Sequence, residues 1–353
     1  MIVLGEPNPL PRQSTMAFHS EAGAALVFLI LYVAVFSGML AAYLSHRIKW
    51  RSRWSILFFH VTVRVASQAC GIGFAILGFK NVSVFLAFLI LGAEGYFTLV
   101  LCTFRFVISW HQHNLPGGVS WLEPRRGTNS QLTTRQRTRR IVLFIVLGPF
   151  AILFFHDNLM AAFHTVLILA NTAIIIGGSF LANANLSQFD SPDTQHKLHI
   201  SRITRTAGQS VFLACNVLLL VILLVTARND RRTGGRKGLL RVHPTLVVLT
   251  ITWIPLIIRG VFGVLQSADF VLSYYDPNNY GEFGFTPHFT VVEYLMGVTT
   301  EWVACVLLCS TYFTSKHDPP KPAIENQSKS IPQPDVNPQT ELPLEQEKDG
   351  VEM

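Results

Sequence analysis

Residues 23–44 read GAALVFLILYVAVFSGMLAAYL, an apolar stretch of 22 residues without a charged side chain. A helix needs about 20 such residues to cross a membrane, because each adds about 1.5 Å toward a hydrocarbon core of about 30 Å. Six further stretches are long and mostly apolar: 56–77, 82–109, 159–181, 204–225, 244–264 and 289–314. The sequence therefore predicts an all-α polytopic membrane protein built as a seven-helix transmembrane bundle.

The distribution of charge supports this class. Half of the residues are hydrophobic and 14% are charged, whereas soluble domains carry about 25% charged residues. The net charge of +7 does not indicate nucleic-acid binding, because the basic residues cluster in short loops between apolar stretches. Basic loops of membrane proteins lie in the cytoplasm. We therefore expect cytoplasmic loops at 45–54, 110–140 and 227–243, and the lipid bilayer as a partner.

A shorter apolar run at 141–155 decides the number of spans. Its 15 residues cover only about 22 Å as a helix, less than the core. If it does not span, all three basic loops are cytoplasmic and the acidic segment 266–288 lies outside. We therefore expect seven spans with the N-terminus outside and the C-terminus in the cytoplasm, and 141–155 as a re-entrant or interfacial element. Eight spans remain the alternative.

The regions outside the predicted bundle, 23–314, have a different composition. Residues 1–22 form an external segment, and residues 315–353 are rich in Pro, Glu, Gln and Lys. Such a composition buries too little apolar surface to fold, so we expect a disordered cytoplasmic tail. The seven-span arrangement places the sequon at Asn185 outside, which makes it a glycosylation site. Nothing distinguishes the plasma membrane from an endomembrane.

Polar residues inside the predicted spans are the candidate functional residues, since charge in a membrane is costly and pairs or lines a cavity. They form a candidate intramembrane polar site of eight residues: Arg64, Gln68, Glu94, Asn171, Asn216, Arg259, Glu293 and Glu301. From their depths we expect Arg64 to pair with Glu94 or Glu301, and Arg259 to pair with Glu293. These pairs either serve helix packing alone or surround a small-molecule or lipid ligand.

Other residues give weaker indications. His60 and Arg64 are four residues apart on one helix face, but His60 is expected near the cytoplasmic interface. Tyr274, Tyr275 and Tyr280 are expected in an interfacial aromatic belt rather than over a pocket. The five cysteines lie in apolar stretches without a CxxC pair. Nothing in the sequence gathers metal ligands, and no cofactor is indicated.

Several blocks of the chain resemble a family. Residues 58–68, FFHVTVRVASQ, and 89–110, LILGAEGYFTLVLCTFRFVISW, are similar to uncharacterised fungal multi-span membrane proteins. Residues 205–210, 252–266 and 311–320 fit as well. The resemblance implies a fungal source and a helical membrane fold, and it implies no activity. More loosely, the architecture is similar to fungal seven-span lipid-exporter-like and receptor-like proteins.

These observations leave three classes of function open. The first two are a transporter or translocator, and a receptor-like sensor, of a small or lipidic molecule. The third is an intramembrane enzyme, such as an isoprenoid cyclase with Glu94 or Glu301 as general acid, or an accessory protein of a fungal secondary-metabolite cluster. A cation beside a carboxyl group favours its ionised form, so the enzyme is the least favoured of the three.

Overall fold

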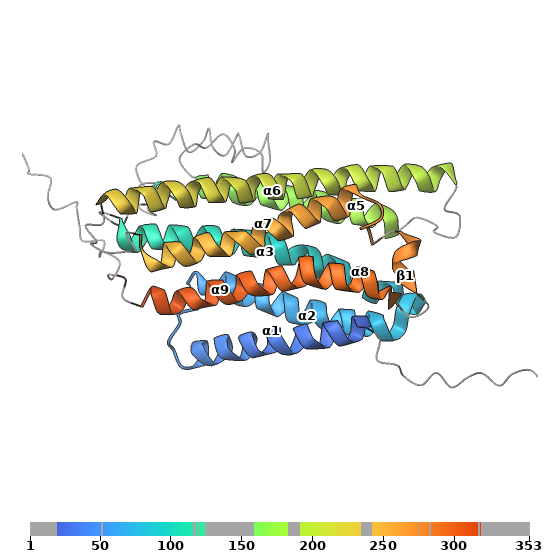
Figure 1. Cartoon of the computed structure of the whole chain (residues 1–353), viewed down its shortest axis with the longest axis horizontal. Helices are drawn as coiled ribbons and strands as arrows, with labels where there is room; N and C mark the ends of the chain where they lie inside the picture. Colours follow the sequence, from blue (N-terminus) through green and yellow to red (C-terminus); the bar gives the residue numbers. More distant parts are fainter. Residues whose placement is uncertain are drawn as a thin grey trace, which may run out of the picture.

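The computed structural model describes residues 20–123 apart from 51, 116, 117 and 119, then 159–182, 191–233, 242–316 apart from 275, 282 and 283, and 318. Within these residues, seven helices are long and apolar enough to cross a membrane (Figure 1). This confirms the predicted helical fold and the number of apolar helices. Asn185, the run 141–155, residues 1–19, most of the tail and much of the second basic loop lie outside the described residues.

Six of the seven helices are single α-helices, and the last one has three parts. The single helices are α1 (Ser20–Leu44), α2 (Trp54–Leu77), α3 (Val82–Asn114), α5 (Leu159–Ala182), α6 (Pro192–Thr233) and α7 (Pro244–Ala268). The last consists of α8 (Pro287–Val292), the π-helical segment η7 (Glu293–Thr299) and α9 (Thr300–Thr314). Two helix starts follow capping rules, since His243 and Thr286 accept backbone N–H groups and a proline follows each.

Helices α3 and α5 run antiparallel. Their contacts pair residues that ascend on one helix and descend on the other: Phe104 stacks on Phe163 and Glu94 meets Asn171. The backbone N–H of Met160 also donates to the carbonyl of Leu122, 3.0 Å away, so α5 begins where α3 has ended. A single extra crossing between them would make the two helices parallel. The antiparallel arrangement of these described helices is the one expected if the run 141–155 does not span.

The two ends of the bundle differ. One end, the hairpin end, carries the short antiparallel strands β1 (Tyr280–Gly281) and β2 (Gly284–Phe285), after the 3₁₀ turn η6 (Pro277–Asn279). There the carboxylate of Glu21, at the start of α1, accepts the backbone N–H of Phe285 at 3.0 Å. Residues 20–22, predicted as external, thus belong to α1. The turn η1 (Gly78–Asn81) joins α2 to α3 at the same end.

The opposite end, the basic end, holds Arg47, Lys49 and Arg53 after α1 and Arg231 and Arg232 at the end of α6. Arg53 donates to Ser109 of α3 at 3.2 Å and to Ser315 after α9 at 2.6 Å. Three helices are therefore tied together at the end where the sequence predicts cytoplasmic loops.

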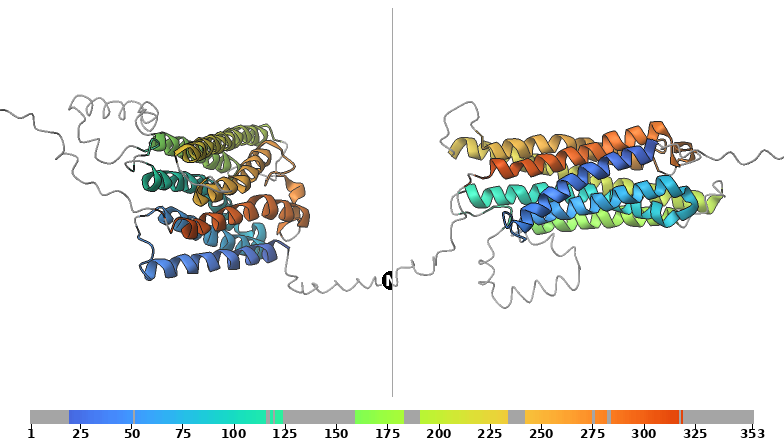
Figure 2. Two further views of the ribbon diagram at one scale, coloured as in Figure 1. Left: turned by 60° about the vertical axis from the view of Figure 1, so that its left-hand side comes forward. Right: turned by 90° about the horizontal axis from the view of Figure 1, so that it is seen from below.

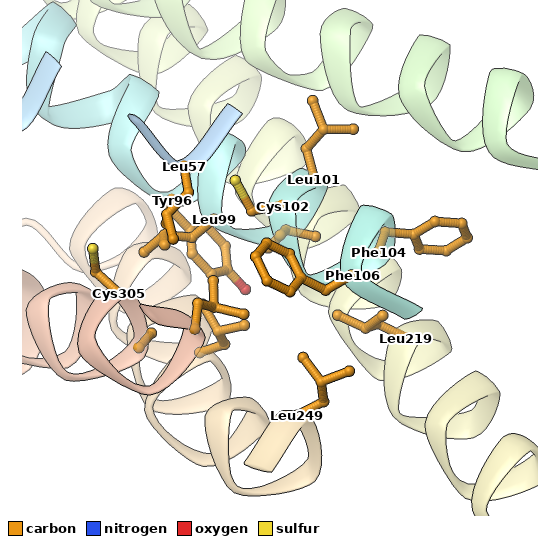
Figure 3. Close-up of a cluster of buried hydrophobic side chains, with 14 of the residues drawn as sticks. Leu57, Tyr96, Leu99, Leu101, Cys102, Phe104, Phe106, Leu219, Leu249 and Cys305 are labelled. Carbon is orange, nitrogen blue, oxygen red and sulfur yellow. The ribbon is translucent and has the colours of Figure 1, made fainter. Parts of the chain in front are cut away.

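A packed apolar core runs through the bundle, and Figure 3 shows part of it. Helix α3 supplies its centre with Tyr96, Leu99, Cys102 and Phe106, which are at most 1% exposed. They meet buried side chains of four other helices: Leu57, Leu219, Leu249 and Cys305. In contrast, large apolar side chains such as Ile30 and Ile76 are 60% and 73% exposed on the outside. An apolar exterior around a packed interior is the pattern of a bundle in lipid.

Helix α1 lies at one edge of the bundle and α6 at the opposite edge, with α3 and α7 between them (Figure 1, Figure 2). Helix α6 has 42 residues and is about 63 Å long, twice the thickness of a hydrocarbon core. It extends well beyond the predicted span 204–225 at both ends, so its apolar part is only the middle of a longer helix.

Candidate functional site

The centre of the bundle contains a carboxylate between two arginines. Glu301 of α9 is fully buried, and its Oε1 accepts from Nε of Arg259 of α7 at 2.6 Å. Its Oε2 lies 2.9 Å from Nη2 of Arg64 of α2, an ion pair without hydrogen-bond alignment. Arg64 and Arg259 are 3% and 7% exposed. One carboxylate therefore joins three helices far apart in the sequence.

This arrangement selects one predicted pair and corrects another. Arg64 pairs with Glu301, one of its two expected partners. Arg259 was expected to pair with Glu293, and that prediction is wrong, because Arg259 uses Glu301. Glu293 instead accepts from Nε2 of Gln266 at 2.6 Å. The four charges, from two arginines and two glutamates, balance one another.

The close approach of these groups depends on Gly95 of α3. A Cβ atom at this position would collide with the Glu301 carboxylate and come within 3.1 Å of Nη1 of Arg64. The neighbouring carbonyl of Gly92 faces the same guanidinium, 3.5 Å from its Nη1. Gly92 and Gly95 thus let the backbone of α3 lie directly against the buried ions.

A cavity of about 140 Å³ adjoins the charged cluster and lies in the half of the bundle toward the hairpin end. Its polar side includes Arg64, Gln68, Arg205, Gln209, Arg259, Gln266, Glu293 and Glu301. Its other side is apolar, with Leu86, Leu89 and Ile90 of α3 and Ile174 and Ile175 of α5. The cavity is therefore amphipathic, and it joins five residues of the predicted polar site in one space.

Tyr274, in the loop after α7, also lines this cavity. The sequence favoured an interfacial belt over the cap of a pocket for this tyrosine, and its place in the cavity lining agrees with the less favoured alternative. Burial and the nearby Glu293 carboxylate raise the pKa of Tyr274 well above its ordinary value. Its hydroxyl is therefore neutral over the whole physiological pH range.

The other three predicted residues lie elsewhere. Glu94 of α3 is half-buried, and its Oε1 accepts from Nδ2 of Asn171 of α5 at 2.5 Å. Asn216 is fully buried in α6, where its backbone carbonyl accepts a hydrogen bond from the indole N–H of Trp253. Arg105 of α3 pairs with Glu123, which lies beyond the end of that helix, at 3.3 Å.

His60, which was expected near the cytoplasmic interface, does not reach the surface of the bundle. The imidazole is fully buried one helical turn from Arg64. Its Nδ1 lies 2.8 Å from the hydroxyl of Thr98, and its ring meets Tyr32 edge-on. A buried, hydrogen-bonded histidine of this kind belongs to the packing beside the charged cluster.

Sequence reasoning did not single out Gln209, Gln266 or Arg205 as site residues, although all three line the cavity. Gln209 lies within the predicted span 204–225, and an amide in an apolar stretch is the signal that identified Gln68. Gln266 and Arg205 fall just outside or at the ends of apolar stretches, where polar residues are ordinary. Their position beside the cavity follows only from the three-dimensional arrangement of the helices.

The carboxyl group of Glu94 should matter little for stability. We expect Glu94→Gln to change the free energy of unfolding by less than about 1 kcal/mol, because glutamine can still accept from Asn171 and no ion pair is lost. Thermal unfolding of the purified protein in detergent measures this. A loss of several kcal/mol would mean that Glu94 has a charged partner that the described residues do not contain.

Among the described residues, no group of three or more His, Cys, Asp or Glu side chains is placed to hold a metal ion. The cavity offers amides, ion pairs and an apolar wall, which suit a small amphipathic molecule. Comparison with protein-family models, curated proteins and solved structures found no match to the chain.

Proposed function

We propose that this chain is a multi-pass membrane protein that binds a small amphipathic molecule in the cavity, in order to translocate or to sense it. Seven apolar helices with an apolar exterior support the membrane location. The arginine-rich basic end favours a cytoplasmic C-terminus and an external N-terminus. The cavity then lies in the outer half of the membrane.

The observation that carries this proposal is the two-sided lining of the cavity. Ligand sites are mostly apolar with a few placed polar groups that fix orientation, and this lining has both. A bundle in which charges served packing alone has no need of an adjoining space. Leu99 and Cys305, in the packed core on the other side of the ion pairs, are fully buried, whereas the cavity adjoins these pairs toward the hairpin end.

The enzyme hypothesis receives less support. A cyclase needs a carboxyl group that protonates its substrate, and both carboxylate oxygens of Glu301 face arginines. Glu94, the other candidate acid, faces Asn171. Transport and sensing both begin with binding, and both fit a cavity closed toward the basic end.

Filling the cavity should abolish binding without unfolding the protein. Gly92 lines the cavity, and a Cβ atom there meets nothing within 4 Å. We expect Gly92→Leu to lose labelling by photoreactive hexadecanol, hexadecanoic acid and hexadecylamine, measured on protein in lipid nanodiscs by mass spectrometry of labelled peptides. Gly38→Leu is the matched control, since Gly38 has equal space but lies on the exposed face of α1.

If at least one of the three probes labels cavity residues in the wild type and in Gly38→Leu but not in Gly92→Leu, the proposed function stands. If all three label every variant alike, the cavity is not a binding site. Reconstitution of the protein in vesicles then separates the two functions: movement of the bound probe between leaflets indicates translocation, and its absence favours sensing.

A further inference from the structure

Helices α3 and α5 contact each other toward the basic end, and both line the cavity toward the hairpin end. The rings of Phe104 and Phe163 stack at 4.1 Å, and closer to the hairpin end Glu94 accepts a hydrogen bond from Asn171. Beyond that contact, α3 and α5 both turn residues into the cavity. The two helices therefore form one wall of the cavity, and the Glu94–Asn171 hydrogen bond bounds the gap between them on the side of the basic end.

This gap reaches the outside of the bundle. Ile90 of α3 lines the cavity and is also 45% exposed, and Ser179 of α5 likewise lines the cavity and is exposed. Leu86 and Ile175 complete the rim. We call these four residues the portal. Because the portal lies on the side of the bundle, it faces lipid rather than water when the helices span a membrane.

The polar side of the cavity has unused hydrogen-bonding atoms. Among the described residues, neither the Nε2 nor the Oε1 of Gln68 has a hydrogen-bond partner, and the side chain is 0% exposed. The Oε1 of Gln209 and Nη1 of Arg259 are unpartnered as well. These two atoms converge, since a Cβ on Gly263 would lie 2.6 Å from one and 3.2 Å from the other. Buried amides without partners are costly, so the free atoms indicate a polar ligand group.

The charges of the central cluster, in contrast, are already compensated. Arg64 and Arg259 share Glu301, and Glu293 lies close to the same arginines. A ligand with its own charge would have to compete with these pairs inside a low-dielectric space. Arg205 adds a third arginine to the lining. An anionic amphiphile is therefore the charged ligand that this cavity would favour most, and it is the best comparison for a neutral one.

We propose that the portal admits, from the surrounding membrane, a single-chain amphiphile whose neutral hydroxyl or carbonyl head binds Gln68. This inference rests on the proposed function and names its ligand class and route of entry. A cavity of about 140 Å³ resembles in size an engineered cavity that holds a benzene molecule. It accommodates a head group and the first few carbons, so the rest of the chain extends through the portal into lipid.

The test uses hexadecanol and hexadecanoic acid, each with a mid-chain diazirine, on the full chain in nanodiscs. We expect hexadecanol to label portal residues of α3 and α5 more strongly than the acid does. Gln68→Leu should weaken this labelling by about five- to tenfold, as expected for the loss of a buried hydrogen bond. Ile90→Trp and, from the opposite rim, Ser179→Trp should slow labelling by blocking the portal.

Ile76→Trp is the control for the blocking variants, because Ile76 is 73% exposed on α2 and does not line the cavity. If hexadecanoic acid labels more strongly than hexadecanol, and Gly92→Leu abolishes that labelling, the proposal of a neutral head group is wrong and the proposed function still stands. Unchanged labelling in both tryptophan variants, with Ile76→Trp equal to them, would overturn lateral entry. If neither of these probes nor hexadecylamine responds to Gly92→Leu, the proposed function itself falls.

Discussion

Replacing Glu301 by glutamine is expected to destabilise the protein by about 3–5 kcal/mol, the cost of leaving a buried charge without its partner. Glu301 is 0% exposed and its carboxylate serves two buried arginines at once. Glutamine keeps the shape but removes the charge, so Arg64 and Arg259 would face each other across a neutral amide. The measurement is thermal unfolding in detergent, followed with a thiol-reactive dye.

The chain provides its own reporters for this measurement, because Cys102 is 0% and Cys215 8% exposed in the folded state. Glu94→Gln, with its neutral partner, is the matched control and should unfold close to the wild type. A quadruple variant, Arg64→Met, Arg259→Met, Glu293→Gln and Glu301→Leu, should recover most of the lost stability, since replacement of a whole buried ion cluster by neutral groups is often neutral for stability. A Glu301→Gln protein as stable as the control would show that the arginines have other compensation.

Alanine at Gly208 is expected to cost about 2–3 kcal/mol, the upper range for overpacking a filled core. Gly208 of α6 faces α5, where a Cβ atom would lie 2.7 Å from the backbone carbonyl of Ala170 and 2.6 Å from Ile174. A side chain can move away, but a carbonyl of a helix cannot. The two helices would have to separate along the wall that carries Ile174 and Ile175.

Gly38→Ala should have the opposite effect on the free energy of unfolding. Gly38 is in the interior of α1 and nothing lies within 4 Å of a Cβ there, so alanine stabilises the helix by up to about 1 kcal/mol. The same thermal unfolding assay compares the two variants. Equal melting temperatures of the two variants would contradict this prediction, because they would mean that α5 and α6 can move apart at Gly208 without cost.

The sequence predicted the helices because apolar length alone identifies them. The seven predicted stretches each fall within a helix or, for 289–314, within the composite last helix. It missed the ends of α6, because residues 192–203 and 226–233 are polar and carry no lipid signal. They continue the helix through ordinary helix chemistry: Lys197 pairs with Asp193 at 2.6 Å, and Arg231 and Arg232 complement the dipole at the last turn.

The site was predicted in part for a similar reason. Depth along a span can be counted from its ends, and this brought Arg64, Glu94 and Glu301 to the same level. Rotation about the helix axis cannot be counted, and it separates Glu94, which faces α5, from Glu301, which faces the arginines. The same uncertainty gave Arg259 the wrong partner. The assignment to a fungal family stays a prediction, as do glycosylation of Asn185 and a disordered tail.

The π-helical segment η7 has a consequence for anyone comparing this chain with a relative. A π-helical segment takes up one residue more than α-helix over the same length. Glu293 and Glu301, eight residues apart, thus stand as residues seven apart do in an α-helix, about two turns along one face. Both line the cavity. A relative without the extra residue would keep both carboxylates in place, and a correct alignment would show a one-residue gap between them, marking the site inside a helix rather than in a loop.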